Sequence, residues 1–280
     1  MTQDFVFDFW NNRAHLGTRA GSDDMIAKLL EIEALARRLH DGLSMAEFGC
    51  GNGITAIELA RRFKVRIEGF DFSPEMIAEA RRLAADAKVA DRVCFEVADI
   101  RTQPVLAERF DVVYSERMII NLPDWKSQAE AIRTLAGYLK PGGQLLLCEN
   151  SSVGHEALNA LREAAGLPTI VPPWHNRYLD DGLVAALKIP EMRLAEVDAY
   201  SSIYYFLSRV VNAWLASREG KEPVYDAPVN QLALLLPAFG SCAQGKLWVW
   251  QRDTAEAATA VTGVPSGCVV RHDVSETRIE

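Results

Sequence analysis

The 280-residue chain has little that would build a disulfide framework, a zinc site or a membrane span. Its five cysteines, at positions 50, 94, 148, 242 and 268, form no Cys-x-x-Cys pair, and their number is odd. We therefore expect reduced thiols and a cytoplasmic location. No apolar run approaches the roughly 18 residues that a membrane span needs. The first ten residues, MTQDFVFDFW, lack the basic start and apolar core of a signal peptide.

An excess of positive charge is also missing. The chain has 38 acidic and 30 basic side chains, for a formal net charge of -8. Because an acidic chain repels a phosphate backbone, we expect no nucleic-acid partner. Hydrophobic residues make up 49 % and charged residues 24 %, which is typical of a soluble globular protein rather than a disordered one. No ligand cluster suggests a metal, and we expect none.

From residue 43 onward, strand-like and helix-like segments alternate. This alternation predicts right-handed crossovers and a mostly parallel sheet with helices on both faces, a Rossmann-like α/β fold. The run Leu145–Cys148 has no polar alternation, as expected for a strand covered on both faces. We expect strands at 43–48, 65–70, 92–97, 110–114 and 144–148, and helices at 54–62, 73–89 and 124–139.

Segments on either side of this core complete the expected domain organisation. Residues 1–40 should form a helical cap with helices at 4–14 and 22–39. Ser22 or Asp23 should cap the second of these helices, whose expected apolar stripe is Met25, Leu29, Ile32, Leu35 and Leu39. Residues 41–253 form the main domain, in which 151–182 shows no period. Later elements are expected at 191–199, 203–216, 231–236 and 246–251, followed by a loose tail at 254–280.

A glycine-rich turn joins the first strand to the next helix. The segment Glu47–Gly53 has the spacing G-x-G-x-G, and Ile54 stands where the dinucleotide fingerprint G-x-G-x-x-G places its last glycine. Glycine allows a tight turn and a close approach of the backbone to a ligand. The Glu47 carboxylate at this turn disfavours a pyrophosphate and suits a cationic ligand.

Acidic residues also end the next two strands. Asp71 lies 22 residues after Gly49, where a carboxylate can accept the hydroxyls of a ribose. Asp99 follows the third strand, where it can accept a hydrogen bond from an adenine amino group while Ile100 covers the ring. Since ligands of open α/β sheets bind at the carboxyl ends of the strands, Glu47, Asp71 and Asp99 predict one binding site.

As an ordered set, these motifs resemble the class I S-adenosylmethionine-dependent methyltransferases. The resemblance covers roughly residues 43–150 and includes Phe110–Tyr114 and the stop Leu139–Gly143. It implies S-adenosylmethionine as the cofactor and a seventh, antiparallel strand at 246–251. It implies that Gly49 and Gly51 pack on the methionine part, that Asp71 holds the ribose and that Asp99 meets the adenine. The remaining cofactor candidates are Glu47, Cys50, Phe72, Met76, Ile100, Ser115 and Arg13, the last as a partner of the cofactor carboxylate.

Methyl transfer requires alignment of donor and acceptor, and removal of a proton if the acceptor is a hydroxyl. We expect acceptor-binding insertions at about 151–190 and 200–240, together with residues 115–121 after the fourth strand. His175 is the first candidate for the general base and His155 the second, although either could simply hold a loop. The candidate acceptor-binding residues are Arg117, Asn121, Trp174, Asn176, Tyr178 and Tyr204.

The expected activity is methylation of a small polar molecule, most simply at oxygen. Residues 150–250 loosely resemble sugar- and glycan-modifying methyltransferases, which puts a sugar among the candidates. This second resemblance rests on Asn159–Arg162, Pro173–Asn176 and Tyr204-Tyr205. Methylation at nitrogen or carbon, a nicotinamide-dependent oxidoreductase and a non-catalytic cofactor-binding protein remain as alternatives. The sequence also leaves open a homodimer.

Overall fold

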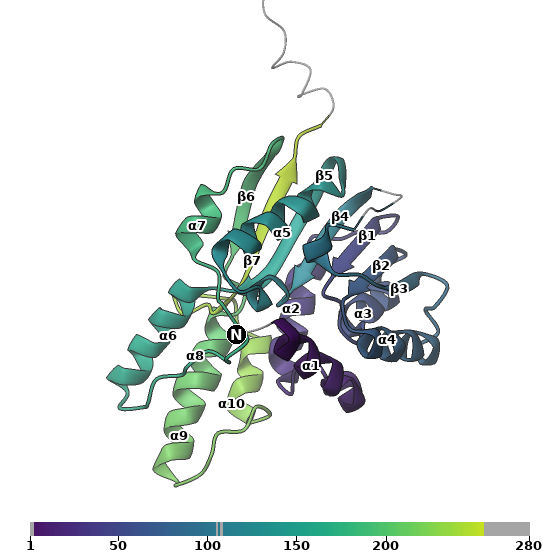
Figure 1. The fold of residues 1–280 in the computed structure, drawn as a ribbon. Helices are drawn as coiled ribbons and strands as arrows, with labels where there is room; N and C mark the ends of the chain where they lie inside the picture. The colour runs from purple at the N-terminus through teal and green to yellow at the C-terminus, as the bar shows by residue number, and fades with distance from the viewer. Residues whose placement is uncertain (1–2, 105, 107–108, 255–280) are drawn as a thin grey trace, which may run out of the picture.

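A computed structural model describes residues 3–104, 106 and 109–254 of the chain. Its centre is a seven-stranded sheet in the order β3-β2-β1-β4-β5-β7-β6 (Figure 1). The first five strands pair in parallel, whereas β7 runs antiparallel to both β5 and β6. The strands are β1 (Ser44–Phe48), β2 (Arg66–Asp71), β3 (Val93–Val97), β4 (Phe110–Glu116), β5 (Leu139–Asn150), β6 (Met192–Asp198) and β7 (Gly245–Arg252).

Helices cover both faces of the sheet, and a group of later helices extends beyond it (Figure 1). The α-helices are α1 (Gln3–Arg13), α2 (Met25–Ala36), α3 (Ile54–Arg62), α4 (Pro74–Asp86), α5 (Trp125–Gly137), α6 (Ser152–Ala164), α7 (Asp181–Ala186), α8 (Ser202–Phe206), α9 (Asn212–Arg218) and α10 (Pro228–Gln231). Short turns are η1 (Ala14–Arg19), η2 (Ile100–Thr102), η3 (Ile119–Asn121), η4 (Leu207–Val211) and η5 (Leu232–Leu234). Within the described part of the chain, no helix is long and apolar enough to cross a membrane.

The strands supply alternating side chains to two separate cores. In β4, for example, Val112 faces the core under α2, α3 and α4, while Val113 faces the core under α5 and α7. In β7, Val249 and Trp248 divide in the same way. This two-sided burial explains the lack of polar alternation in the central strands. The predicted Rossmann-like fold class and the antiparallel last strand are therefore confirmed.

The N-terminal helix α2 differs from its predicted apolar stripe. Asp24, not Ser22 or Asp23, caps it, because the Asp24 carboxylate accepts the Ala27 N–H at 3.1 Å. Met25 and Leu29 are 38 % and 39 % exposed. The buried face instead carries a charged pair, Lys28 and Glu31, beside Ile32 and Leu35. The buried face of α2 therefore lies about one residue away from the face that the apolar positions predicted.

The segment predicted to be irregular at 151–182 contains the 13-residue helix α6, so that prediction was wrong. Ser151 caps α6 by accepting the Gly154 N–H at 2.9 Å. The helix buries Leu158, but the same face also carries His155, Asn159 and Arg162, which bond to backbone carbonyl groups of other segments. A polar inward face hides the apolar period on which the prediction depended.

The helix predicted at 203–216 is present, with a change of helical type in the middle. Residues 202–218 run as α8, η4 and α9, and η4 is a π-helical turn. Single π turns inside α-helices occur frequently at functional sites. In this chain the π turn contains Arg209, which reaches into the cavity described below.

Candidate active site

A cavity of about 400 Å³ opens at the carboxyl ends of the parallel strands. We call it the main cavity. Its lining comes from α1, α2, the glycine turn, the ends of β2, β4 and β5, and the later helices. A smaller space of about 60 Å³, the side slot, adjoins it and is lined by Phe48, Phe72, Ala98, Asp99, Ile100 and Leu122, among others. Gly49, Asp71, Phe72, Met118 and Asn121 line both spaces, which form one continuous site.

Two glycines of the turn have different roles. Gly49 has φ +73°, and a Cβ there would lie 2.3 Å from the Met118 side chain. Gly51 has φ +52°, but a Cβ there would meet nothing within 4 Å. Packing against Met118 therefore requires Gly49, whereas Gly51 faces open space in the main cavity. The structure places both of them, and Cys50 between them, in the cavity wall.

Asp71 is fixed at the junction of the two spaces. One carboxylate oxygen accepts the Gly51 N–H at 2.8 Å, and the other accepts the Ser73 N–H at 2.9 Å. Burial raises the Asp71 pKa to about 6 in spite of these hydrogen bonds. The Phe72 N–H adds a third backbone hydrogen bond. Since a carboxylate has about four acceptor positions, Asp71 keeps room for a ligand hydroxyl.

The other two predicted acids lie on either side of Asp71. Asp99 lines the side slot, with Arg101 bonded to its carboxylate, beside the buried Ile100. Glu47 is 1 % exposed in the main cavity and accepts the Tyr114 hydroxyl at 3.1 Å. Burial raises the Glu47 pKa to about 8, and Glu116 adds to the shift. The predicted grouping of three acids at the strand ends is present.

The N-terminal segment closes one side of the main cavity. Arg13 lines it and donates to the Ala20 carbonyl at 2.8 Å. Trp10 donates to the Asn121 side chain at 3.0 Å. Met76, at the start of α4, and Phe72 also line the cavity as predicted. Ser115 does not: it is fully buried, and its hydroxyl donates to Glu149 at 2.7 Å.

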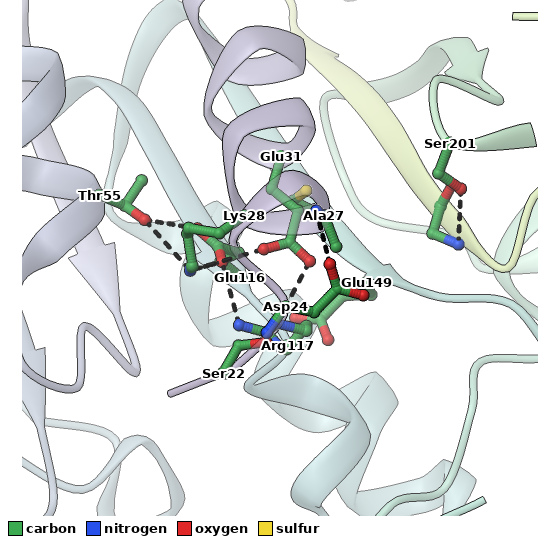
Figure 2. A network of polar contacts seen from close by, with 12 residues as sticks. Ser22, Asp24, Ala27, Lys28, Glu31, Thr55, Glu116, Arg117, Glu149 and Ser201 are labelled. Carbon is green, nitrogen blue, oxygen red and sulfur yellow. Dashed lines mark hydrogen bonds and ion pairs between the residues drawn. The ribbon is translucent and has the colours of Figure 1, made fainter. Parts of the chain in front are cut away.

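A network of buried charges forms the floor of the main cavity (Figure 2). It consists of Lys28 and Glu31 from α2, Thr55 from α3, and Glu116 and Arg117 at the end of β4. Lys28 pairs with both carboxylates. The Arg117 guanidinium lies 3.3 Å from Glu31 and 3.6 Å from Glu116, and the Thr55 hydroxyl donates to Glu116 at 2.6 Å.

Of this network, Arg117 was predicted by name as a site residue. Lys28 and Glu31 were missed because charged residues on an amphipathic helix normally face solvent. Their position was a usable signal, since Lys28 and Glu31 share one helix face with Ile32 and Leu35 at spacings of three and four. Glu116 lies in the segment 115–121, which was expected on the acceptor side after the fourth strand, but it was not named as a site residue.

The far end of the main cavity combines tyrosines, amides and Arg209. The Tyr178 hydroxyl accepts from Gln244 at 3.3 Å and bonds with Asn150 and Asn176. The Arg209 guanidinium lies over the rings of Tyr225 and Tyr205, at 4.8 and 5.3 Å from their centroids. The predicted residues Arg117, Asn121, Asn176 and Tyr178 line the cavity.

Two predicted acceptor residues are not part of the lining. Tyr204 is fully buried, and its hydroxyl donates to Asp24, while its neighbour Tyr205 lines the cavity. Trp174 is 41 % exposed and packs edge-on against His175. In both cases the next residue in the sequence, Tyr205 or His175, reaches the cavity instead. The composition of these segments does not reveal which of two neighbouring side chains faces the cavity.

The two candidate bases are in very different surroundings. His175 lines the cavity within an aromatic group formed by Phe9, Trp10 and Trp174. Burial and the nearby Arg13 lower its pKa to about 4. His155 lies outside the lining, with its two ring nitrogens 2.9 Å from the Gln244 side chain and the Ile170 carbonyl. His155 therefore holds the 167–171 segment against α6 and has no nitrogen facing the cavity.

The central part of the chain matches a known protein family. Residues 45–143 match the family model described as a methyltransferase domain. This part of the chain belongs to the methyltransferase family. The matched range runs from β1 into the start of β5, and so includes the glycine turn, Asp71 and Asp99. It confirms the family to which the motifs of residues 43–150 pointed.

Several proteins are similar to this methyltransferase domain. A 27-O-demethylrifamycin SV methyltransferase of Amycolatopsis mediterranei is 32 % identical over 51 % of this chain and 53 % of its own length. A chloroplastic tocopherol O-methyltransferase of Arabidopsis thaliana is 30 % identical over 49 % of this chain and 36 % of its own length. This chain thus spans about half or less of these two relatives.

One solved structure is similar to this chain in fold over most of its length, although the two sequences have diverged. The magnesium protoporphyrin IX methyltransferase of Synechocystis PCC 6803, determined with bound S-adenosylhomocysteine, superposes with a TM-score of 0.56. It is 15 % identical, and the match covers 90 % of this chain and all of that one. At this identity the likeness shows the fold.

Proposed function

We propose that this chain transfers a methyl group from S-adenosylmethionine to an oxygen atom of a small polar molecule. The observation that carries the proposal is the continuous site made by the open Gly51, the Asp71 carboxylate and the side slot beside Asp99 and Ile100. We assign these three features to the methionine, ribose and adenine parts of this cofactor, in that order.

The charges of the main cavity favour a cationic cofactor. Its lining has five acidic side chains, from Asp24, Glu31, Glu47, Asp71 and Glu116, and four cationic ones, from Arg13, Lys28, Arg117 and Arg209. Because burial raises the pKa of Glu31 and Glu47, these two can ionise when a cation binds and so compensate its charge. S-adenosylmethionine carries a sulfonium and an ammonium group against one carboxylate, a net charge of about +1 near neutral pH. A nicotinamide dinucleotide would bring a pyrophosphate to the buried Glu47, which is unfavourable.

The far end of the cavity suits a hydroxylated acceptor. Amide groups of Asn150, Asn176 and Gln244 surround the Tyr178 hydroxyl, and the Tyr205 and Tyr225 rings provide apolar faces. This mixture of amides and aromatic rings fits a sugar or another polyol as well as a phenol. The two curated relatives described above are named for methylation of an oxygen or of a demethylated natural product, which agrees with this acceptor class.

Calorimetric titration tests the cofactor first. We expect S-adenosylhomocysteine to bind with a micromolar dissociation constant and NAD not to bind. Methyl-labelled S-adenosylmethionine is then offered with methyl α-D-glucopyranoside, catechol and ethanolamine, and the products are analysed by mass spectrometry and NMR. Label on oxygen supports the proposal, and label on nitrogen or carbon corrects the acceptor atom. Binding of NAD alone would contradict the proposed activity.

A further inference from the structure

Glu31 and Glu116 form a carboxyl pair inside the main cavity. Glu31 comes from α2 and Glu116 from the end of β4, and they are 4 % and 7 % exposed. Their side chains are in hydrogen-bond contact with each other. Two ionised carboxylates this close repel one another, so a single proton shared between them stabilises the pair.

The surroundings place that proton on Glu31. Glu116 receives the Thr55 hydroxyl at 2.6 Å. The Lys28 ammonium, the hydrogen bond from Glu31 and the Arg117 guanidinium hold its pKa low against the effect of burial. Glu31 Oε2 has no hydrogen-bond partner among the described residues and is 3.5 Å from Lys28. Burial raises the Glu31 pKa above its usual range, although Arg117 opposes the shift, and Glu116 adds to it.

Glu31 lies between the two ends of the cavity. Its charge acts on Arg117, Glu116 and Lys28 on the side of the glycine turn, and on Tyr205, which lines the acceptor end of the cavity. Figure 2 shows its carboxylate pointing at Lys28, Glu116 and Arg117. His175, at the same cavity, has its ring enclosed by aromatic side chains and is a weak base.

We propose that Glu31 is the group that takes up the proton of the acceptor hydroxyl, which rests on the proposed O-methyl transfer. Once Glu31 has released the proton of the pair to solvent, the hydroxyl O–H bond breaks and its proton passes to the Glu31 carboxylate. The oxygen forms a bond to the methyl carbon while the methyl–sulfur bond breaks, and its electron pair stays on sulfur. S-adenosylhomocysteine leaves as a neutral thioether, and Glu31 then returns the proton to solvent.

The affinities of S-adenosylmethionine and S-adenosylhomocysteine, compared across pH, test whether the Glu31 carboxylate faces the reacting sulfur. S-adenosylmethionine carries a sulfonium charge that S-adenosylhomocysteine lacks, while their other ionisable groups are the same. Dissociation constants of both are measured by calorimetry between pH 6.5 and 9. In the wild type we expect the ratio to shift toward S-adenosylmethionine by about fivefold as Glu31 ionises. In Glu31→Gln we expect only the smaller shift that comes from the cofactor's own amino group, whose pKa the sulfonium lowers.

Control variants identify the titrating group. Glu33→Gln changes an exposed acid on the same helix, paired with Arg62, and should behave as wild type. Glu47→Gln removes the other cavity carboxyl whose pKa is raised, and should retain most of the shift. If Glu47→Gln loses the shift while Glu31→Gln keeps it, the proposal is overturned.

Other outcomes separate this proposal from the proposed function. If neither compound binds, the proposed function fails. If both bind with a ratio independent of pH in the wild type, only the role of Glu31 fails. Should Glu31→Gln not fold, Glu31→Asp must move the midpoint of the shift, and an unchanged midpoint overturns the proposal. With the fastest alcohol of the acceptor panel, Glu31→Gln should lower kcat about 100-fold at unchanged S-adenosylhomocysteine affinity.

Discussion

The Arg209 guanidinium donates to the Asp24 carboxylate at 2.6 Å, which joins residues 185 positions apart across the main cavity. Asp24 is the N-cap of α2, and Arg209 lies in the π turn of the last long helix. The carboxylate also accepts the Tyr204 hydroxyl and the Ala27 N–H. This pair ties the N-terminal helix to the acceptor end of the site.

Replacing Arg209 should therefore destabilise the fold. Arg209→Met leaves a buried carboxylate without its ionic partner, and we expect a loss of about 3 kcal/mol in the free energy of unfolding. Denaturant titration followed by circular dichroism measures it. Arg218→Met, an exposed arginine of α9, is the matched control and should change little. The double variant Asp24→Asn/Arg209→Met should be less destabilised than the sum of the single variants, and strict additivity would mean that the two side chains act independently.

Asp71 should control cofactor affinity and its pH dependence. Asp71→Ala should weaken S-adenosylhomocysteine binding by about 1–3 kcal/mol, the scale of hydrogen bonds to a charged group. Since burial raises the Asp71 pKa to about 6, the wild-type carboxyl is mostly protonated at pH 5 and ionised at pH 7. A ligand that binds the ionised form should therefore bind more tightly as pH rises through 6.

Calorimetry between pH 5 and 7.5 checks this dependence. Asp71→Asn removes the titration but keeps the size of the side chain, so its affinity should be low and flat across the range. Wild-type affinity in Asp71→Ala would remove Asp71 from the cofactor site.

His175 should contribute shape more than proton transfer. Its pKa of about 4 means that it is neutral at physiological pH and a weak base. His175→Phe keeps a ring against Phe9 and Trp10, so turnover should remain within a few-fold of wild type. His175→Ala opens the aromatic group and should lower turnover with little change in S-adenosylhomocysteine affinity. Steady-state kinetics distinguishes the two, and an equally severe loss in both variants would restore His175 as the base.

Gly154, in the first turn of α6, should not tolerate a side chain. A Cβ at this position would lie 1.8 Å from the Ala243 carbonyl oxygen, so the backbone must move. We expect Gly154→Ala to lower the free energy of unfolding by about 3 kcal/mol. Gly137→Ala is the matched control, because a Cβ there meets nothing within 4 Å and alanine favours a helix. A thermal melt of each variant suffices, and equal melting temperatures would disprove the close contact.

Local sequence features were sufficient for the part of the chain that matches the methyltransferase domain, residues 45–143. Helix α3 has the predicted bounds 54–62, and Ser73 caps α4 by accepting the Met76 N–H, as the Ser-Pro-Glu start predicted. Strand ends and glycine turns are determined by neighbours in sequence. Asp71 and Gly51 therefore reach the cavity for reasons that are readable in the chain. The role of Asp71 and the domain boundaries remain predictions.

Only the tertiary structure decided the acceptor end and the floor of the cavity. Lys28, Glu31 and Glu116 become a site because α2 packs its charged face against the end of β4, 88 residues away in the case of Lys28 and Glu116. Helix α6 escaped prediction because it buries polar side chains that bond to distant carbonyl groups. The orientation of α8 about its axis turns Tyr205 toward the cavity and buries Tyr204 in the core. Periodicity reports where apolar side chains are buried, whereas a buried charge depends on partners that only the folded chain brings together.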